Sequence, residues 1–156
     1  MNVRMELSRI LIRELNDVQI IELREMRDDE SMPEGDPAVR TFPIVIGLPE
    51  AQAIERRLKG VIIKRPQTHD LLANIIETLG AKLQSISVTK LEEHTYFATL
   101  DILRADGYAS RIDCRPSDAI AIGIGVGVPI YVDESVLQAA IKDEDDDLPD
   151  MDDTLA

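Results

Sequence analysis

The sequence predicts an α+β fold, with a mixed, mostly antiparallel sheet and about four helices. Several short segments alternate apolar and polar residues, which is typical of strands that bury one face. Other segments carry apolar residues at helical spacing, begin near a proline and end at a glycine. The chain has 156 residues, of which 44% are hydrophobic, so one domain can bury a core without a structural metal or disulfide.

Three strands are expected in the first third of the chain. Residues 3–8 alternate in character, and the apolar phase shifts by one residue near Arg9, which predicts a β-bulge. Residues 18–23, "VQIIEL", form the second strand. Residues 41–47, "TFPIVIG", are apolar on both faces and therefore predict a central strand.

Two helices are expected next. Pro49 suits the first turn of one helix, and Gly60 can end it. Its apolar stripe consists of Ala51, Ile54 and Leu58. The second helix has the clearest pattern, from Asp70 to a left-handed C-cap at Gly80. Its apolar residues lie on one face, namely Leu71, Leu72, Ile75, Ile76 and Leu79.

Strand signals return over residues 82–91, 96–103 and 108–115. The last two strands permit a register test, because paired residues must point to the same face. A two-residue turn at 106–107 would oppose Ile102 and Arg111, which mixes the faces. A three-residue loop at 105–107, with Gly107 left-handed, instead pairs like with like. It sets Asp101 against Arg111 and Leu100 against Ile112, and leaves Thr99, Asp101, Arg111, Asp113 and Arg115 on one polar face.

The C-terminal part predicts a buried helix, a strand and a last helix. Residues 119–128, "AIAIGIGVGV", are apolar all round, as in a helix buried on every side. Each of its three glycines costs a helix up to about 1 kcal/mol relative to alanine, so we expect it to end early. Residues 129–132 read as a short strand, followed by a helix over 134–142. The residues expected to face inward from that helix are Val136, Leu137, Ala140 and Ile141.

A weak internal repeat runs through this pattern. Two stretches, from "IELRE" to "PEAQAI" and from "FATLDIL" to "RPSDAIAI", each read strand, strand, proline-started helix. Duplication of a β-β-α unit explains the similarity, and chance resemblance of a short pattern is the alternative.

The formal net charge of −13 is concentrated in two segments. Residues 143–156 hold eight acids and no base, residues 25–37 hold six acids and one arginine, and the remaining 16 acids balance 16 bases. We therefore expect one domain over 1–142, with an acidic loop at 25–37, and a disordered acidic tail at 143–156. The tail is interpreted as a solubility segment; the alternative is a detachable mimic of nucleic acid that covers a basic face.

Composition also bounds the compartment and the partners. Cys114 is the single cysteine, which excludes an internal disulfide, and no apolar secretion segment follows the N-terminus. No stretch approaches about 18 uninterrupted apolar residues, so we expect a cytoplasmic protein with no membrane partner. The chain has only two phenylalanines and three tyrosines to stack on bases. Weak to moderate nucleic-acid binding is therefore expected unless the protein oligomerises or uses a metal.

Several blocks in order resemble one known family. They include "FPIVIGLPEAQAI", "RPQTHDLL", "IDCRPSDAIAI" and "PIYVDESVL", within a similarity that runs from about Met5 to Leu137. Together they are similar to the bifunctional nuclease domain family. The resemblance implies a compact α+β fold, self-association as a homodimer or higher homo-oligomer, and hydrolysis of DNA and RNA. The chain departs from the family pattern at Cys114, where alanine is more usual, at "GIGVGV", which lacks an arginine, and in the acidic loop.

Nuclease chemistry requires a group that activates water, groups that bear the charge developing on phosphate, and usually a divalent metal. Two similar stretches, "RPQTHD" at 65–70 and "RPSD" at 115–118, supply such groups just ahead of a helix. His69 is the expected general base. The expected catalytic carboxylates are Asp70, Asp113 and Asp118.

Asp113 and Asp118 flank a strand-to-helix corner and are the expected ligands of a divalent cation, Mg²⁺ or Mn²⁺. No organic cofactor is expected. Arg65, Arg115 and Ser117 are expected to bind phosphate near helix N-termini.

Each of these residues has a structural alternative. Ser117 and Thr68 suit helix caps, and the aspartates of the first helical turns suit the helix macrodipole. Asp113 and Arg115 equally suit a set of surface or interface ion pairs. His94, in a charged turn, is read as a solvated loop residue.

Two further functions stay open beside a nuclease. One is a non-enzymatic oligomeric scaffold or regulatory binding domain, which the all-apolar stretch at 119–132 favours because it must be covered. The other is a sensor of small anions or nucleotides that uses the two helix N-termini.

Overall fold

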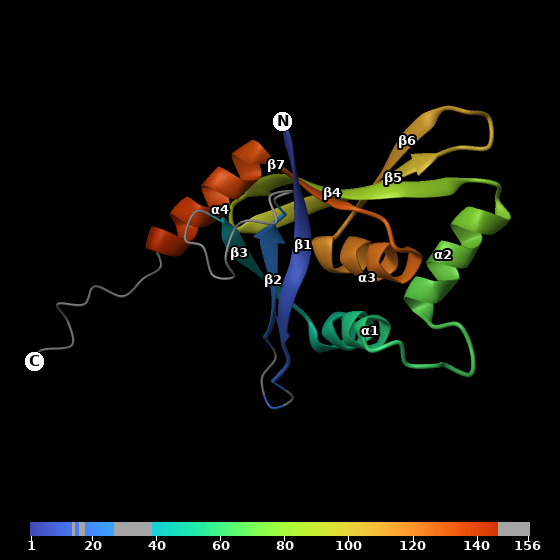
Figure 1. Ribbon diagram of the computed structural model, residues 1–156, viewed down its shortest axis with the longest axis horizontal. Coiled ribbons are helices and arrows are strands. Elements are labelled where there is room, and N and C mark those ends of the chain that lie inside the picture. Colours follow the sequence, from blue (N-terminus) through green and yellow to red (C-terminus); the bar gives the residue numbers. More distant parts are fainter. Residues whose placement is uncertain (14, 16–17, 27–38, 147–156) are drawn as a thin grey trace, which may run out of the picture.

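The computed structural model describes residues 1–13, 15, 18–26 and 39–146, with only the backbone for 144–146. Seven strands form one mixed sheet with the order β3-β2-β1-β7-β4-β5-β6 (Figure 1). The strands are β1 (Asn2–Leu11), β2 (Gln19–Glu25), β3 (Thr41–Ile46), β4 (Lys82–Glu92), β5 (Thr95–Leu103), β6 (Ala109–Cys114) and β7 (Ile130–Asp133). The helices are α1 (Leu48–Leu58), α2 (Thr68–Thr78), α3 (Pro116–Val126) and α4 (Glu134–Asp146). This confirms the predicted α+β class.

The sheet consists of two similar halves joined by β7. Strands β1, β2 and β3 pair antiparallel in one half, and β4, β5 and β6 do so in the other. Strand β7 lies between them, antiparallel to β1 and parallel to β4. Each half runs directly into a helix with proline in its first turn, α1 or α3. The predicted β-β-α succession is therefore present twice, while its origin by duplication stays a prediction.

Helices α1 and α3 pack side by side, and α2 and α4 lie at opposite ends of the molecule (Figure 1). One apolar core joins the inner faces of the strands to α1, α3 and α4. The sheet is strongly curled. The evidence is that the ring of Phe42 in β3 stacks on the ring of Tyr96 in β5, with 5.7 Å between the centroids. Four strands separate β3 from β5 along the sheet. No helix in the described ranges is long and apolar enough to cross a membrane.

Two predicted details of pairing are confirmed. The register of β1 against β2 shifts between Leu7 and Arg9, as expected for a bulge. Strand β5 pairs with β6 in the predicted register, with Leu100 opposite Ile112 and Asp101 opposite Arg111. Gly107 in the connecting loop has the expected positive φ, 88°.

The prediction that residues 41–47 form a central strand was wrong. Strand β3 is at the edge of the sheet, and its Val45 is 63% exposed. Pro43 is the signal that marks an edge strand, because proline has no N–H to donate to a second neighbour. The apolar residues on its other face are buried under α4.

The expected early end of the glycine-rich helix was also wrong, since α3 runs through Gly123 and Gly125 to Val126. A Cβ at Gly123 would lie 3.1 Å from the side chain of Ile86, and one at Gly125 would lie 3.0 Å from Nε of Arg57. The glycines therefore allow β4 and α1 to pack closely, and this contact offsets their low helix propensity.

The acidic segments correspond only in part to the prediction. Helix α4 continues to Asp146, so residues 143–146 are helical rather than the start of a disordered tail. Residues 147–156, and residues 27–37 of the predicted acidic loop, lie outside the described residues. Glu25, at the start of that loop, instead belongs to β2.

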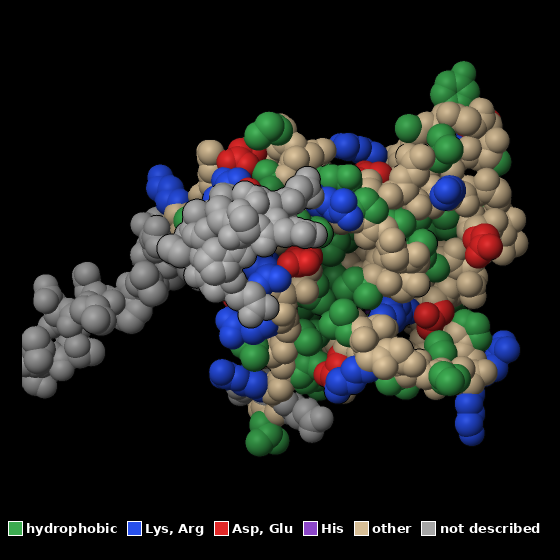
Figure 2. Space-filling model, viewed as in Figure 1, with side chains coloured by type: hydrophobic (Ala, Val, Ile, Leu, Met, Phe, Trp, Pro, Cys, Tyr) green, Lys and Arg blue, Asp and Glu red, His purple; other side chains and the backbone are tan. Residues whose placement is uncertain are grey.

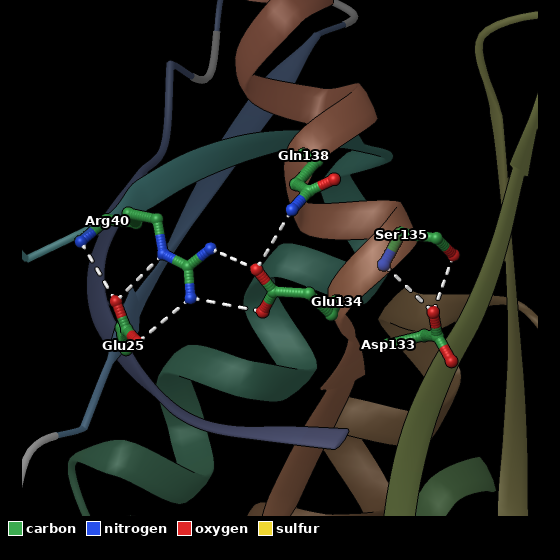
Figure 3. A network of polar contacts seen from close by, with 6 residues as sticks. All are labelled: Glu25, Arg40, Asp133, Glu134, Ser135 and Gln138. Atoms are coloured by element: carbon green, nitrogen blue, oxygen red, sulfur yellow. Dashed lines mark hydrogen bonds and ion pairs between the residues drawn. The ribbon is translucent and has the colours of Figure 1, made fainter. Parts of the chain in front are cut away.

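An ionic cluster ties β2 to α4 (Figure 3). Arg40 donates two hydrogen bonds to Glu25, at 3.1 and 3.0 Å, and two to Glu134, at 2.5 and 3.1 Å. These bonds raise the pKa of Arg40, and the bond from Arg40 lowers the pKa of Glu134. Next to it, Asp133 accepts hydrogen bonds from the backbone N–H and hydroxyl of Ser135 and so begins α4 (Figure 3).

Candidate functional site

Three helices carry an acid at the third position of their first turn. These acids are Glu50 in α1, Asp70 in α2 and Asp118 in α3. The N-terminus of a helix carries a partial positive charge, so a carboxylate there is stabilised. Glu50 and Asp118 are joined through one arginine, so the starts of α1 and α3 lie close together.

The two similar stretches of the sequence meet at Asp118. Nε2 of His69 lies 2.9 Å from Oδ1 of Asp118. Arg115 donates from Nε to Oδ2 of Asp118 at 2.9 Å and from Nη2 to Oδ1 at 3.0 Å. Nη2 of Arg115 also contacts Glu50 at 3.0 Å. His69 and Asp118 are 49 positions apart in the chain. Together with Arg115 and Glu50 they form one group, called here the helix-start cluster.

The electrostatics of this cluster favour an ionised Asp118. Partial burial alone would raise the pKa of Asp118, but the hydrogen bonds from Arg115 and His69 outweigh it and leave the pKa below 3.8. The same bond to Asp118, with a second one to Glu50, raises the pKa of Arg115. The side chain of His69 is only 13% exposed, whereas that of Arg115 is 64% exposed. The arginine is therefore the part of the cluster that solvent and ligands reach most easily.

Asp70 lies beside this cluster and is engaged in helix capping. Its Oδ2 accepts from the backbone N–H of Gln67 at 3.0 Å, in a capping box that starts α2. Its Oδ1 accepts from Nη2 of Arg57 at 2.7 Å. Arg57 belongs to α1, so this ion pair anchors α2 to α1; Arg57 also donates to the carbonyl of Ala53 in its own helix. These contacts support the structural interpretation of Asp70.

Asp113 stands apart from the helix-start cluster. It is exposed on β6 opposite Thr99, and its carboxylate forms no hydrogen bond or ion pair with any residue that the structure describes. On the same face, Asp101 accepts hydrogen bonds from three hydroxyls and pairs with Arg111 at 3.5 Å. The hydroxyls belong to Ser85, Ser87 and Thr99.

The described side chains include no group of three or more His, Cys, Asp or Glu arranged to hold a metal ion. Both oxygens of Asp118 already accept hydrogen bonds from Arg115. A cation bound to Asp118 would also be repelled by that guanidinium. The arrangement therefore does not fit a metal shared by Asp113 and Asp118.

Between these aspartates lies Cys114, at the junction of β6 and α3. Burial raises the pKa of its thiol to about 11, and the charges of Asp118, Asp113 and Asp101 add to the effect. The thiol is thus protonated at neutral pH and a poor nucleophile.

The two remaining phosphate-binding candidates differ in position. Arg65 is exposed in the connection between α1 and α2, where Lys and Arg side chains project from the surface (Figure 2), and it forms no ion pair with any described residue. Ser117 is 5% exposed and is the second residue of α3, whose N-cap is Arg115. It lies on the wall of a hollow of about 780 Å³ that also reaches Arg115.

This hollow is bordered by β3, by the β4–β5 turn, by the start of α3 and by the end of α4. Its far side carries His94, whose Nδ1 lies 3.8 Å from the carboxylate of Asp143, and the partly buried ring of Tyr96. The hollow thus combines an exposed guanidinium, a hydroxyl, an imidazole and an aromatic ring. His94 lies in the turn between β4 and β5 and its side chain is 82% exposed, as predicted for a solvated loop residue, and it also borders the hollow.

Sequence reasoning missed Glu50 and the aromatic wall of the hollow. The signal for Glu50 was its place after Pro49, in the same first-turn position as Asp118 after Pro116. No local signal identifies Tyr96, because its contact with Phe42 arises from the curl of the sheet.

Comparison with known proteins assigns the family. The bifunctional nuclease domain matches residues 34–145. An uncharacterised protein of Mycobacterium tuberculosis is 43% identical over 111 residues, which cover 69% of this chain and 65% of that protein. Bifunctional nuclease 1 of Arabidopsis thaliana is 30% identical over 96 residues, or 60% of this chain and 29% of the plant protein. Bifunctional nuclease 2 of Oryza sativa subsp. japonica is 27% identical over 97 residues, covering 61% and 30% of the two chains.

The chain thus aligns with less than two thirds of the length of each of these relatives. The matched residues begin after β1 and β2, although these two strands belong to the same sheet as the rest. The match covers most of the chain, including both RP-containing stretches and the whole helix-start cluster. The chain belongs to the bifunctional nuclease domain family.

Proposed function

We propose that this protein hydrolyses phosphodiester bonds of nucleic acid at the helix-start cluster. The observation that carries the proposal is the contact of His69 with Asp118, whose carboxylate also binds the exposed Arg115. A histidine oriented by a carboxylate, next to an exposed cation, supplies a base and a phosphate ligand in one place. Family membership and the plant relatives named bifunctional nucleases support this reaction class.

Within this proposal His69 is the general base. In this scheme an ionised Asp118 accepts a hydrogen bond from Nε2–H of the imidazole, which leaves the lone pair on Nδ1. Nδ1 then removes a proton from water as its oxygen attacks phosphorus. The bond from phosphorus to the leaving oxygen breaks, that oxygen takes up a proton from solvent, and the imidazolium returns its proton to solvent. Asp118 is a positioning residue that also stabilises the imidazolium formed in this step.

Arg115 binds the phosphate in this scheme. Its guanidinium is exposed and lines the hollow of about 780 Å³, so a phosphodiester entering from that side meets it first. Phosphate oxygens accept paired hydrogen bonds from arginine. They would compete with Glu50 for Nη2. Ser117, on the wall of the same hollow, offers a hydroxyl to the same group.

Asp113 lies outside the helix-start cluster and its carboxylate has no described polar partner, so in this proposal it would hold a divalent cation only together with oxygens of a bound substrate. Mg²⁺ is commonly held by one or two carboxylates together with substrate phosphate and water. In this proposal a divalent cation would supply charge that stabilises the phosphate oxygens. Asp118 is not among its ligands unless Arg115 moves away. We further propose that the protein acts in the cytoplasm, as its lone cysteine suggests.

The test is cleavage of labelled single-stranded RNA and DNA in Mg²⁺, in Mn²⁺ and in EDTA. We expect His69→Gln to lower the rate about 100-fold or more, as for loss of a general base. Asp113→Asn should lower the cleavage rate only in the samples that contain Mg²⁺ or Mn²⁺. Asp106→Asn is the matched control, because Asp106 lies in the β5–β6 turn and pairs with Arg104. Equal, trace-level cleavage by all identically purified variants would assign the activity to a contaminant and refute the proposal.

A second candidate function is a non-enzymatic oligomeric scaffold or regulatory binding domain. One observation favours it, which is that α2 buries none of its 11 residues, although five of them are apolar. Under this alternative the helix-start cluster serves only to join α1, α2 and α3.

A further inference from the structure

The connection between α1 and α2 has a local excess of positive charge. Residues 56–65, "RRLKGVIIKR", hold five of the 17 Lys and Arg of the chain and no acid. Two of the five are paired with described carboxylates, Arg57 with Asp70 and Lys59 with Glu55. The other three form no ion pair with any residue that the structure describes, namely Arg56, Lys64 and Arg65. Three uncompensated cations so close together in the chain indicate a surface that attracts anions.

Arg56 differs from the other two because it borders a recess. This recess has a volume of about 170 Å³ and lies between the end of α1 and the start of α2. Nε of Arg56 is buried and has no hydrogen-bond partner among the described residues. Buried N–H groups of folded proteins almost always have an acceptor. An oxygen of a ligand in the recess would supply one.

The carboxylate in the recess does not compensate Arg56. Asp70 is the single acid among the described residues that line the recess. Its Oδ1 accepts a hydrogen bond from Arg57, and its Oδ2 accepts one from the backbone of Gln67. Both oxygens are therefore engaged, and the charge of Arg57 balances that of Asp70. The recess is left with one net positive charge, that of Arg56.

The size of the recess limits what it can hold. Pockets that enclose drug-sized ligands have volumes of about 300–1,000 Å³, whereas this recess has about 170 Å³. A water molecule occupies about 30 Å³ in the liquid, so the recess suits a group of a few non-hydrogen atoms. An arginine side chain in a recess of this size fits a tetrahedral anion such as a phosphate group.

The recess lies beside the helix-start cluster. Asp70 lines the recess, and the preceding residue, His69, contacts Asp118 with 2.9 Å between Nε2 and Oδ1. His69 and Asp70 both belong to the first turn of α2. A nucleic-acid chain carries a phosphate at every nucleotide, so a chain held at Arg115 has further phosphates on either side of the bound one.

We propose that this recess binds, through Arg56, a phosphate that flanks the cleaved one. The identity of the ligand as a chain phosphate rests on the proposed function. The substrate class is then an oligonucleotide or polynucleotide with at least two successive phosphates, rather than an isolated phosphodiester. Contacts to phosphate carry no sequence information, so the recess gives no preference among bases. Lys64 and Arg65, exposed in the same connection, add an attraction that salt screens.

Binding of short DNA ligands in EDTA tests this inference without any cleavage. The ligands are the thymidine dinucleotide TpT, which has one phosphate, and its 5′-phosphorylated and 3′-phosphorylated forms, which have two. One of the two phosphorylated forms should bind the wild type about tenfold more tightly than TpT, as for one added charge-assisted hydrogen bond. Arg56→Gln should abolish this gain, and Arg56→Lys, which keeps the charge, should retain part of it.

Arg9→Gln is the matched control, because it removes the same charge from an exposed arginine of β1. It should leave the gain unchanged. Equal affinity of the wild type for all three ligands, or a full gain in Arg56→Gln, would overturn the inference. The wild-type comparison decides the question even if Arg56→Gln does not fold.

Inorganic phosphate distinguishes a chain phosphate from a free anion. Thermal unfolding should show less stabilisation of the wild type by inorganic phosphate than by the tighter dinucleotide at equal concentration. Equal stabilisation would make the recess a site for free phosphate and would overturn the inference. Because binding is measured without turnover, a missing gain beside intact cleavage refutes this inference alone. A gain without cleavage refutes only the proposed hydrolysis.

Discussion

At the scale of single residues, Asp118 is the centre of the candidate site. It joins a histidine from α2 and an arginine from its own helix, and through Arg115 it reaches α1. The sequence indicated each of these residue types, because the two RP-containing stretches each place an acid in a first helical turn. It did not indicate that Asp118, rather than Asp113, would meet the histidine. That contact depends on the packing of α2 against α3, which no local pattern encodes.

The lowered pKa of Asp118 predicts how its contribution to stability depends on pH. The unfolded chain binds the proton near pH 3.8 and the folded chain binds it only at lower pH, so the stabilisation is complete above 3.8 and is lost as pH falls through the folded-state pKa. Asp118→Asn should therefore lower the Tm at pH 5, and the difference from wild type should shrink toward pH 3. Thermal unfolding over this range checks the prediction. A difference that stays constant or grows on acidification would show that the carboxylate is not stabilised by its partners.

At the scale of elements, polar contacts attach the outer elements to the central sheet. Arg40 links Glu25 at the end of β2 to Glu134 at the start of α4. The side chain of Glu25 is only 12% exposed. Such a carboxylate depends on its hydrogen-bond donors more than an exposed one does.

Arg40→Leu should therefore destabilise the fold by about 1–3 kcal/mol, the usual cost of removing a donor from a buried acceptor. Arg9→Leu removes a comparable ion pair, Arg9 with Glu22, but Arg9 is 66% exposed. That change should cost less than about 1 kcal/mol. Urea unfolding of the two variants measures the contrast. Equal losses would mean that the cluster of Figure 3 contributes no more than a surface ion pair.

The secondary structure was largely predictable at this scale, for physical reasons. Alternation, proline and glycine are local signals, and they located the strands, the bulge near Arg9 and the three-residue loop at Gly107. The wrong predictions concern the tertiary neighbours of an element, which a local pattern does not specify. The glycines of α3 fit close neighbours instead of ending the helix, and β3 is apolar on both faces yet lies at an edge.

At the scale of the whole molecule, the order of the strands was not predicted. Strand β7 joins the two antiparallel halves of the sheet, because it pairs with β1 on one side and with β4 on the other. Such long-range pairings leave little trace in a single sequence. The exposure of the apolar face of α2 was likewise not predictable from the sequence. Its pattern predicts an amphipathic helix, but only the tertiary structure reveals that the core covers little of its apolar face.

Assembly of the whole fold is also what brings the two RP-containing stretches together. The first stretch begins α2 and the second begins α3, and packing of these helices sets His69 against Asp118. If the two residues act as one catalytic unit, as we propose, their losses cannot be independent.

The most direct test compares cleavage rates of labelled RNA and DNA by His69→Gln, Asp118→Asn and the double variant. Circular dichroism of each variant confirms that it is folded. We predict that each single change lowers the rate about 100-fold or more, and that the double change lowers it little further. Rate losses that multiply, or a wild-type rate in either single variant, would contradict a joint role of His69 and Asp118 in hydrolysis.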